Sequence, residues 1–244
     1  MRASSQARHT HQRRVAALAV GVAATSVLIT SCASSTSSTD SASPSTPAQT
    51  AAAACTPARP ATPGSTQAKL TVDGTSRDYT INIPPGYDGT QPLPLVMAFH
   101  GRGRNASQQL LLTSFDTSSD KNNFILVLPN AIKGQWDLPV IPGRATSDTT
   151  FVSELSTALS QRLCVDKTRM YASGMSLGSA MTFALACAPK QSFAAFGGVG
   201  ASFYRPVCNA APPAPIIYFH GTADPVVPYE GGKVAGSPAR SITA

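Results

Sequence analysis

The sequence has few charged residues, and its basic residues do not form a pattern suited to nucleic acid. Charged residues make up 13% of the 244 positions, and the formal net charge is +7. Four arginines lie within the first 14 residues; removing these from the 19 basic residues leaves 15, against 12 acidic ones. No basic stripe interleaved with aromatic residues follows. We therefore expect no nucleic-acid partner.

A long apolar run is missing as well. The run from Val15 to Ile29 is shorter than the roughly 20 residues that a spanning helix needs. It follows Arg13-Arg14 and ends at Ser31-Cys32, which resembles the lipobox of bacterial lipoproteins, where the cysteine is acylated. We expect residues 1–31 to be a lipoprotein-type signal peptide and Cys32 to carry a lipid that anchors the protein to a membrane. Plain secretion with a bystander cysteine, and an uncleaved anchor, are the alternatives.

The remaining cysteines do not have the spacing of a metal site. They show no C-x-x-C pair and no nearby cluster of histidines, so we expect no zinc. Their number is even, and an exported protein folds in an oxidising compartment, so two disulfides are expected, with three possible connectivities. These cysteines are Cys55, Cys164, Cys187 and Cys208.

Two composition changes divide the chain. Residues 32–66 consist largely of Ser, Thr, Ala and Pro and have no apolar period, which predicts a flexible linker. The folded domain is expected over residues 67–244. Its composition allows one sizeable core.

Strands and helices alternate along this domain. Alternating runs from Lys69 to Asp73 and from Arg77 to Ile83, separated by a Gly74-Thr75-Ser76 turn, predict an antiparallel hairpin. The later strands are largely apolar runs of the kind found in sheets covered on both faces. They are expected over 94–100, 124–129, 169–173, 194–200 and 216–220, with helices over 107–122, 148–163 (capped by Ser147 or Asp148) and 179–188. The predicted fold class is α/β, with a mainly parallel sheet and an N-terminal antiparallel hairpin.

One pentapeptide carries the strongest chemical signal. Gly174-Met175-Ser176-Leu177-Gly178 lies between a predicted strand and a predicted helix. The glycines allow the sharp backbone reversal that leaves the serine hydroxyl exposed at the start of a helix. This position suits a nucleophile whose transition state carries an oxyanion. The sequence therefore predicts that Ser176 is a nucleophile, with the N–H of Leu177 as an oxyanion donor.

Other unusual residues follow the ends of predicted parallel strands, where ligands bind in such sheets. The turn that begins at His100 is flexible enough to aim a second N–H at an oxyanion. Asp224 lies in the turn after the last strand, where a triad acid belongs, although it could be only a turn former. Three aromatic residues are candidate walls for a substrate: Trp136, Phe203 and Tyr204. Trp136 could equally cover the sheet edge, and His100 and His220 fit structural roles better than that of a base.

Together these motifs resemble a known family. Over residues 67–232 the chain is similar to α/β-hydrolase esterases of the polyhydroxybutyrate depolymerase and feruloyl esterase type. The matching stretches are 100–101, 134–136, 148–151, 163–166, 171–178, 185–187 and 220–224. The resemblance implies Ser176 as nucleophile, Asp224 as acid, and the amides of Arg102 and Leu177 as the oxyanion hole. It also implies hydrolysis of carboxylic esters, including short polyesters and feruloyl or acetyl esters, without a metal or organic cofactor.

One triad member is missing from the sequence. The order in this fold is Ser, Asp, His, yet none of the four histidines follows Asp224. We expect that a C-terminal segment with the histidine is lacking from this polypeptide, and that the apolar strand 216–219 is consequently an uncovered edge. A non-catalytic envelope protein that keeps the fold for binding is the alternative. The short, proline-rich connection after the strand 194–200 predicts an open cleft without a helical lid.

Overall fold

The structure is a computed structural model, and it describes residues 53–190, 192–201, 208, 211–234, 237–239 and 241. The predicted signal peptide, Cys32 and most of the predicted linker lie outside the described residues. So do Phe203 and Tyr204, together with most of the connection for which an open cleft is predicted.

An antiparallel hairpin opens the domain, as the alternating sequence predicts. β1 (Gly64–Val72) pairs with β2 (Thr75–Ile83), and the register joins Val72 to Thr75. Asp73 and Gly74 form the turn with φ values of 47° and 74°, the positive pair that suits the twist of a two-residue hairpin. β2 is buried at Arg77 and throughout Tyr79–Ile83, which fixes the hairpin on the rest of the sheet.

The described strands build a seven-stranded mixed sheet in the order β1-β2-β4-β3-β5-β6-β7. β2 joins β4 antiparallel, and every later pair is parallel. The carboxyl ends of the parallel strands therefore meet at one edge. Their bounds are β3 Leu93–Phe99, β4 Ile125–Pro129, β5 Val165–Met175, β6 Ala195–Val199 and β7 Ile216–Phe219; a separate hairpin pairs β8 Gly232–Val234 with β9 Ser237–Ala239.

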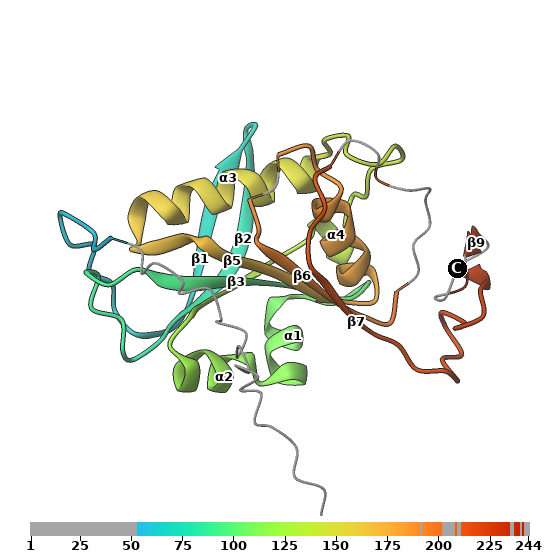
Figure 1. Cartoon of the computed structure of the whole chain (residues 1–244), viewed down its shortest axis with the longest axis horizontal. Coiled ribbons are helices and arrows are strands. Elements are labelled where there is room, and N and C mark those ends of the chain that lie inside the picture. Colours follow the sequence, from blue (N-terminus) through green and yellow to red (C-terminus); the bar gives the residue numbers. More distant parts are fainter. Residues whose placement is uncertain are drawn as a thin grey trace, which may run out of the picture. The chain divides into compact units, whose positions relative to one another are not determined.

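Helices cover both faces of this sheet, with α3 and α4 on one face and α1 and α2 on the other (Figure 1). This layering explains why the central strands are apolar on both faces. Their bounds are α1 Ala106–Thr113, α2 Phe115–Asn122, α3 Ser147–Arg162 and α4 Leu177–Ala186, with a short 3-10 turn, η1, at Ile132–Gly134. Among the described residues no helix is both long and apolar enough to span a bilayer.

Two details of the helices differ from the prediction. The single helix expected over 107–122 is broken at Ser114, whose φ of 48° is left-handed. Since serine is a poor marker of that conformation, the break leaves little trace in the sequence. α3 is capped by Thr146 through a capping box with Thr149, and not by Ser147 or Asp148. Asp148 is instead buried in an ion pair.

The ordered part extends further toward the N terminus than the predicted linker boundary at residue 66. β1 begins at Gly64, and Cys55 forms a disulfide with Cys164. The Arg59 side chain donates to Ser160 O at 2.8 Å, and its own carbonyl accepts from Tyr87 Oη at 2.6 Å. The low-complexity composition hides these contacts because each of them is made with a distant part of the chain.

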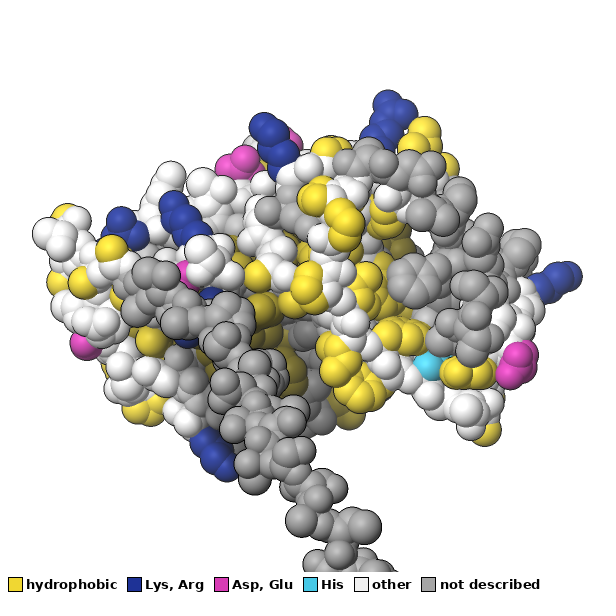
Figure 2. Space-filling model, viewed as in Figure 1, with side chains coloured by type: hydrophobic (Ala, Val, Ile, Leu, Met, Phe, Trp, Pro, Cys, Tyr) yellow, Lys and Arg dark blue, Asp and Glu magenta, His cyan; other side chains and the backbone are white. Residues whose placement is uncertain are grey.

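β7 forms the edge of the sheet opposite to β1, and most of its side chains are exposed. Ile216, Ile217 and Phe219 are 47%, 60% and 58% exposed, and hydrophobic side chains gather on the surface around this strand (Figure 2). This agrees with the predicted uncovered edge. Nearby, Cys187 and Cys208 form the second disulfide, so two disulfides are present as predicted.

Candidate active site

Ser176 occupies the sharp turn between β5 and α4. Its φ of 54° and ψ of −122° lie in a region that non-glycine residues rarely adopt. Its N–H donates to Val199 O at 2.8 Å on the neighbouring β6, and its carbonyl accepts from Ala180 N at 3.1 Å in the first turn of α4. The backbone on both sides thus holds Ser176 in a strained conformation at the carboxyl edge of the sheet.

The two glycines of the pentapeptide are required by packing. A Cβ on Gly178 would lie 2.1 Å from Phe99 O, and one on Gly174 would lie 2.3 Å from Gly178 O. Both clashes are with backbone atoms and could not be relieved by moving a side chain. α4 therefore begins in direct contact with the end of β3, and the sequence prediction of a tight strand-turn-helix is confirmed.

The turn that follows β3 runs beside Ser176. A Cβ on Gly101 would lie 3.6 Å from Ser176 Cβ. Arg102 is next in the chain and is exposed, and Leu177 is the first residue of α4. No hydrogen bond within the described part of the chain uses the amide of Arg102 or of Leu177. Within the described residues these two N–H groups therefore have no hydrogen-bond acceptor.

Residues 134–136, which follow β4, hydrogen-bond to this turn. Gly103 N donates to Gly134 O at 2.8 Å, and the Trp136 indole N–H donates to His100 O at 2.8 Å. The Trp136 ring packs 4.8 Å from the His100 ring and 5.4 Å from the Phe99 ring. Only 2% of Trp136 is exposed. An indole this buried offers no free face to a substrate, so its placement favours the alternative that Trp136 covers the sheet edge.

His100 is fully buried and structural. Its Nε2 accepts from Ala131 N at 3.1 Å, so its Nδ1 carries the hydrogen, which it donates to Gly101 O at 2.8 Å. Burial lowers the pKa of His100, although the Gly101 carbonyl and the Asp148 carboxylate act in the opposite direction. Both ring nitrogens are used, so His100 stays neutral and is not free to act as a base.

The turn after β7 presents Asp224 on the other side of Ser176. Asp224 Oδ1 accepts from Val226 N at 2.8 Å and from Val227 N at 2.9 Å. The amide of Val227 is the main cause that holds the pKa of this carboxyl below its usual value. A Cβ on Gly200, one residue after the Val199 that pairs with Ser176, would lie 3.7 Å from Asp224 Oδ2. The carboxylate and the serine therefore lie at one edge of the sheet, after β7 and β5, with the end of β6 between them.

His220 lies beside this carboxylate but is held by other groups. Its Nε2 donates to Val227 O at 2.7 Å and lies 3.6 Å from Asp224 Oδ2. Its Nδ1 contacts the Tyr218 hydroxyl, which also bonds the backbone of Ala201. Within the described residues, neither histidine forms a hydrogen bond with Ser176. The structure thus brings Ser176, Asp224, Arg102 and Leu177 to one edge without a base among the described histidines.

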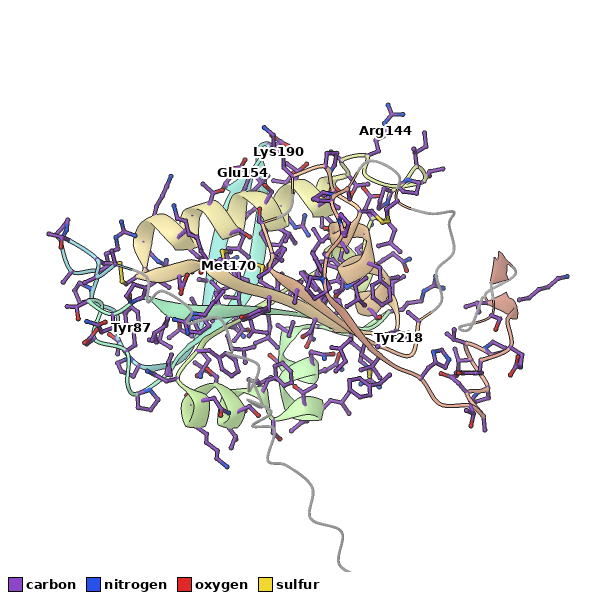
Figure 3. The ribbon with its side chains drawn as sticks, in the orientation of Figure 1. Tyr87, Arg144, Glu154, Met170, Lys190 and Tyr218 are labelled. Carbon is purple, nitrogen blue, oxygen red and sulfur yellow. A yellow bond between two sulfur atoms is a disulfide. The ribbon has the colours of Figure 1, made fainter. Side chains whose placement is uncertain are left out.

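A separate hollow lies at the far end of α4 from Ser176. Its volume is about 390 Å³, and Arg144, Glu154 and Lys190 stand around it on the outer side of α3 and α4 (Figure 3). The hollow is lined by Ala184 and Leu185 at the C-terminal end of α4 and by Ala188 just after it, whereas Ser176 precedes the first residue of that helix. It is therefore distinct from the site at the sheet edge. The described residues contain no group of three or more His, Cys, Asp or Glu that could hold a metal ion.

Sequence reasoning missed the residues that support the turn after β3, which begins at His100 and is called the oxyanion turn below for its proposed role. Arg77 is 3% exposed and lies on the buried, alternating face of β2 with Tyr79, Ile81 and Ile83. A charged residue on the apolar face of a predicted strand was the available signal, because such a residue needs a buried partner. That partner is Asp148, which is 71 positions away in the sequence.

The chain is similar in sequence to several esterases. Over 161 residues the chain is 29% identical to feruloyl esterase C of Emericella nidulans, covering 64% of this chain and 58% of that protein. It is 27% identical to a probable feruloyl esterase C of Aspergillus niger over the same shares. The match to a bifunctional acetylxylan esterase/xylanase of Neocallimastix patriciarum is 28% identical and covers 64% of this chain and 23% of that protein. No family model matches the chain.

Solved structures agree on the architecture. A thermostable esterase has a TM-score of 0.54 at 20% identity and covers 68% of this chain and 48% of its own. A structure described as native sOPH has a TM-score of 0.55 at 13% identity and covers 74% and 73%. The chain has the α/β-hydrolase fold and is similar in sequence to feruloyl esterases. It spans a little over half the length of these curated feruloyl esterase relatives. The resemblance to polyhydroxybutyrate depolymerases stays a prediction.

Proposed function

We propose that the protein hydrolyses carboxylic esters, with Ser176 as the nucleophile. The observation that carries this proposal is the strained backbone of Ser176, which lies between β5 and α4 and beside two unused amides. A purely structural serine has no need of such a conformation, which costs on the order of 1–3 kcal/mol. The names of the feruloyl and acetylxylan esterases support the same reaction class.

In this proposal the chemistry follows acyl transfer through an acyl-enzyme. Ser176 Oγ forms a bond to the ester carbonyl carbon, and the amides of Arg102 and Leu177 stabilise the resulting oxyanion. The C–O bond to the alcohol then breaks, and the proton from Ser176 passes through a base to the leaving alkoxide. Water hydrolyses the acyl-enzyme by the same steps in reverse. Asp224 Oδ2, which accepts no backbone amide within the described turn, would orient the base.

The proposed reaction needs a base to take the proton from Ser176, and neither described histidine is free to do so. His100 uses both ring nitrogens, and His220 donates to Val227 O. We infer that a group other than His100 and His220 takes this role. The second candidate function, an envelope protein that binds through the fold without catalysis, is favoured by one observation, namely that no described histidine contacts Ser176.

The experiment compares Ser176→Ala with Ser173→Ala in the hydrolysis of p-nitrophenyl acetate and butyrate. Ser173 lies on the same strand but before the turn, so it is the matched control. We expect a version with the histidine-bearing segment to be active, Ser173→Ala to keep most of that activity, and Ser176→Ala to lose it. Retained activity in Ser176→Ala would refute the nucleophile, and the absence of any activity would favour the binding protein.

The names of the relatives support a proposal for the substrate class. We propose that short or aromatic acyl esters, such as feruloyl and acetyl esters of polysaccharide, are preferred over emulsified long-chain triglycerides; polyhydroxybutyrate is the further candidate. Rates on methyl ferulate, butyrate esters and triolein emulsion, measured with the completed enzyme, test this. Faster turnover of triolein, with a jump in rate at the oil interface, would contradict it.

We also propose that the protein is exported and anchored to the cell envelope through a lipid on Cys32. The two disulfides support an oxidising compartment. Labelling with a radioactive fatty acid should mark the wild type and not Cys32→Ser. Equal labelling of the two proteins would remove the lipid anchor from the proposal.

A further inference from the structure

A buried ion pair lies under the segment that supports the oxyanion turn. Arg77 and Asp148 are 3% and 2% exposed, and Arg77 Nη2 contacts Asp148 Oδ1. The guanidinium also lies 4.1 Å from the centre of the Phe151 ring. A charged pair this deep carries a large desolvation cost, so it is a weak explanation of stability by itself.

The remaining hydrogen bonds of the pair are made with both ends of one segment, residues 130–137. Arg77 Nη2 donates to Asn130 O at 3.1 Å, directly after β4. Asp148 Oδ2 accepts from Asp137 N at 2.6 Å, seven residues further along the chain. The residues from Asn130 to Asp137 are thereby held at each end by one member of the same ion pair.

The interior of that segment makes the contacts that shape the oxyanion turn. Four contacts join the two: Ala131 N to His100 Nε2, Gly134 O to Gly103 N, the Trp136 indole to His100 O, and Asn130 Oδ1 to Ala106 N at 2.7 Å. These contacts are made with His100, with Gly103 and with Ala106, the first residue of α1 after the turn. Arg102, whose amide is a proposed oxyanion donor, lies between two of these points.

We propose that Arg77 and Asp148 are positioning residues that set the oxyanion turn through the segment 130–137. The ion pair fixes both ends of the segment, the segment fixes His100 and Gly103, and these fix the amide of Arg102 beside Ser176. The naming of the turn as an oxyanion hole rests on the proposed esterase function, whereas the coupling of the ion pair to the turn does not.

The test separates positioning from stability by replacing the pair with apolar residues of similar size. Arg77→Met/Asp148→Leu removes both charges, so neither is left unpaired, and replacements of this kind preserve folding in other proteins. It also removes the acceptor for Asp137 N and the donor for Asn130 O. The exposed pair Lys69 and Asp78 on β1 and β2 gives the matched control, Lys69→Met/Asp78→Leu.

Trp136 reports on the turn without any need for activity, because it is the only tryptophan and it bonds His100 O. We expect Arg77→Met/Asp148→Leu to shift its emission to longer wavelength, to increase its quenching by iodide, and to speed hydrogen exchange at the Gly103 amide. The control should match the wild type. A folded double variant with wild-type emission and wild-type exchange at Gly103 overturns the proposal.

A second variant and a wild-type measurement cover the case in which the double variant does not fold. Asp148→Asn keeps the side-chain volume but loses one acceptor oxygen, and the same shifts are expected in it. In the wild type, the Asp137 and Gly103 amides should exchange hydrogen at the same rate, and this rate should be as slow as that of the amides of β5. Fast, independent exchange of the two would contradict the proposal even if neither variant folded.

In the completed esterase the same double variant should lower kcat about 100-fold, which is the scale of a 1 Å misplacement, and leave KM within about twofold. A purely structural pair would lower the yield of folded protein but not the kcat of the folded fraction. If Ser176→Ala has no effect on hydrolysis, the proposed function fails, while the Trp136 measurement still decides the positioning role.

Discussion

The two sides of Ser176 are built differently. On the side of Arg102, a turn is hydrogen-bonded to the segment 130–137, whose Ala131 and Trp136 are 8% and 2% exposed, and both ends of that segment are bonded to an ion pair whose members are 3% and 2% exposed. On the side of Asp224, a turn is held by its own amides and follows β7, whose isoleucines and phenylalanine are about half exposed. The oxyanion side is thus fixed by the core, whereas the acid side is fixed by local hydrogen bonds.

This difference shows where each half of the proposed chemistry obtains its geometry. Oxyanion stabilisation depends on donors that do not reorganise during the reaction, so a rigid foundation suits it. The acid side needs only to present one carboxylate oxygen to a base, and Asp224 Oδ2 remains available for that within the described turn. The predictions below compare the two sides, beginning with the largest effect.

Truncation of a side chain should lower the free energy of unfolding much more on the oxyanion side than on the acid side. Trp136→Ala leaves a cavity beneath the oxyanion turn and should lower the free energy of unfolding by about 3–5 kcal/mol. Ile217→Ser, at a position that is 60% exposed, should change it by less than about 0.5 kcal/mol. Urea denaturation followed by circular dichroism measures both. Similar losses in the two variants would show that the acid side is as well packed as the oxyanion side.

The sides should also respond to acid in different pH ranges. Burial lowers the pKa of His100, so the unfolded chain binds a proton there before the folded one does, and stability falls as the pH drops below the ordinary histidine value of about 6.5. The pKa of Asp224 is lowered as well, chiefly by the Val227 amide, and its contribution is lost only as the pH falls below about 3.9.

Variants separate these two ranges. His100→Gln should remove part of the loss of stability between about pH 7 and 5, and Asp224→Asn should reduce it only below about pH 4. Unfolding midpoints in urea, measured at each pH, provide the readout. If His100→Gln leaves the slope between pH 7 and 5 unchanged, His100 is not held neutral in the folded state.

The smallest effect concerns association. An exposed edge strand with apolar side chains pairs readily with another chain. Ile217→Lys should therefore reduce concentration-dependent self-association of the described domain, seen by light scattering, without changing its unfolding midpoint. A Leu111→Lys variant is the control, since Leu111 on α1 is 85% exposed but lies away from any strand edge. Equal effects of both variants would show that general surface hydrophobicity, and not the edge, drives association.

Local patterns in the sequence predicted those parts of the fold and site whose causes are local. The hairpin, the parallel strands and the turn at Ser176 all follow from residue patterns a few positions long. The support for the oxyanion turn does not, because Arg77 and Asp148 are 71 positions apart. The break at Ser114 was missed for a related reason, since a left-handed serine has no distinctive neighbour in the sequence. For Trp136 the sequence left two roles open, cover of the sheet edge and wall of a substrate site.

Part of the stretch that composition predicts as a linker contacts the folded domain. The Ser, Thr, Ala and Pro composition before residue 66 predicts a linker, yet Cys55 and Arg59 contact residues after position 159. Contacts of this kind depend on the three-dimensional position of α3 and β5. Composition alone could not indicate them.

The central claim is that Ser176 is a nucleophile beside a formed oxyanion hole and lacks only a base among the described residues. External imidazole can act as that base. With the 244-residue chain and p-nitrophenyl acetate, we predict that imidazole raises the rate of hydrolysis above the rate with imidazole alone, and that Ser176→Ala abolishes this increment while Ser173→Ala keeps it. An equal increment in the wild type and in Ser176→Ala would contradict the claim.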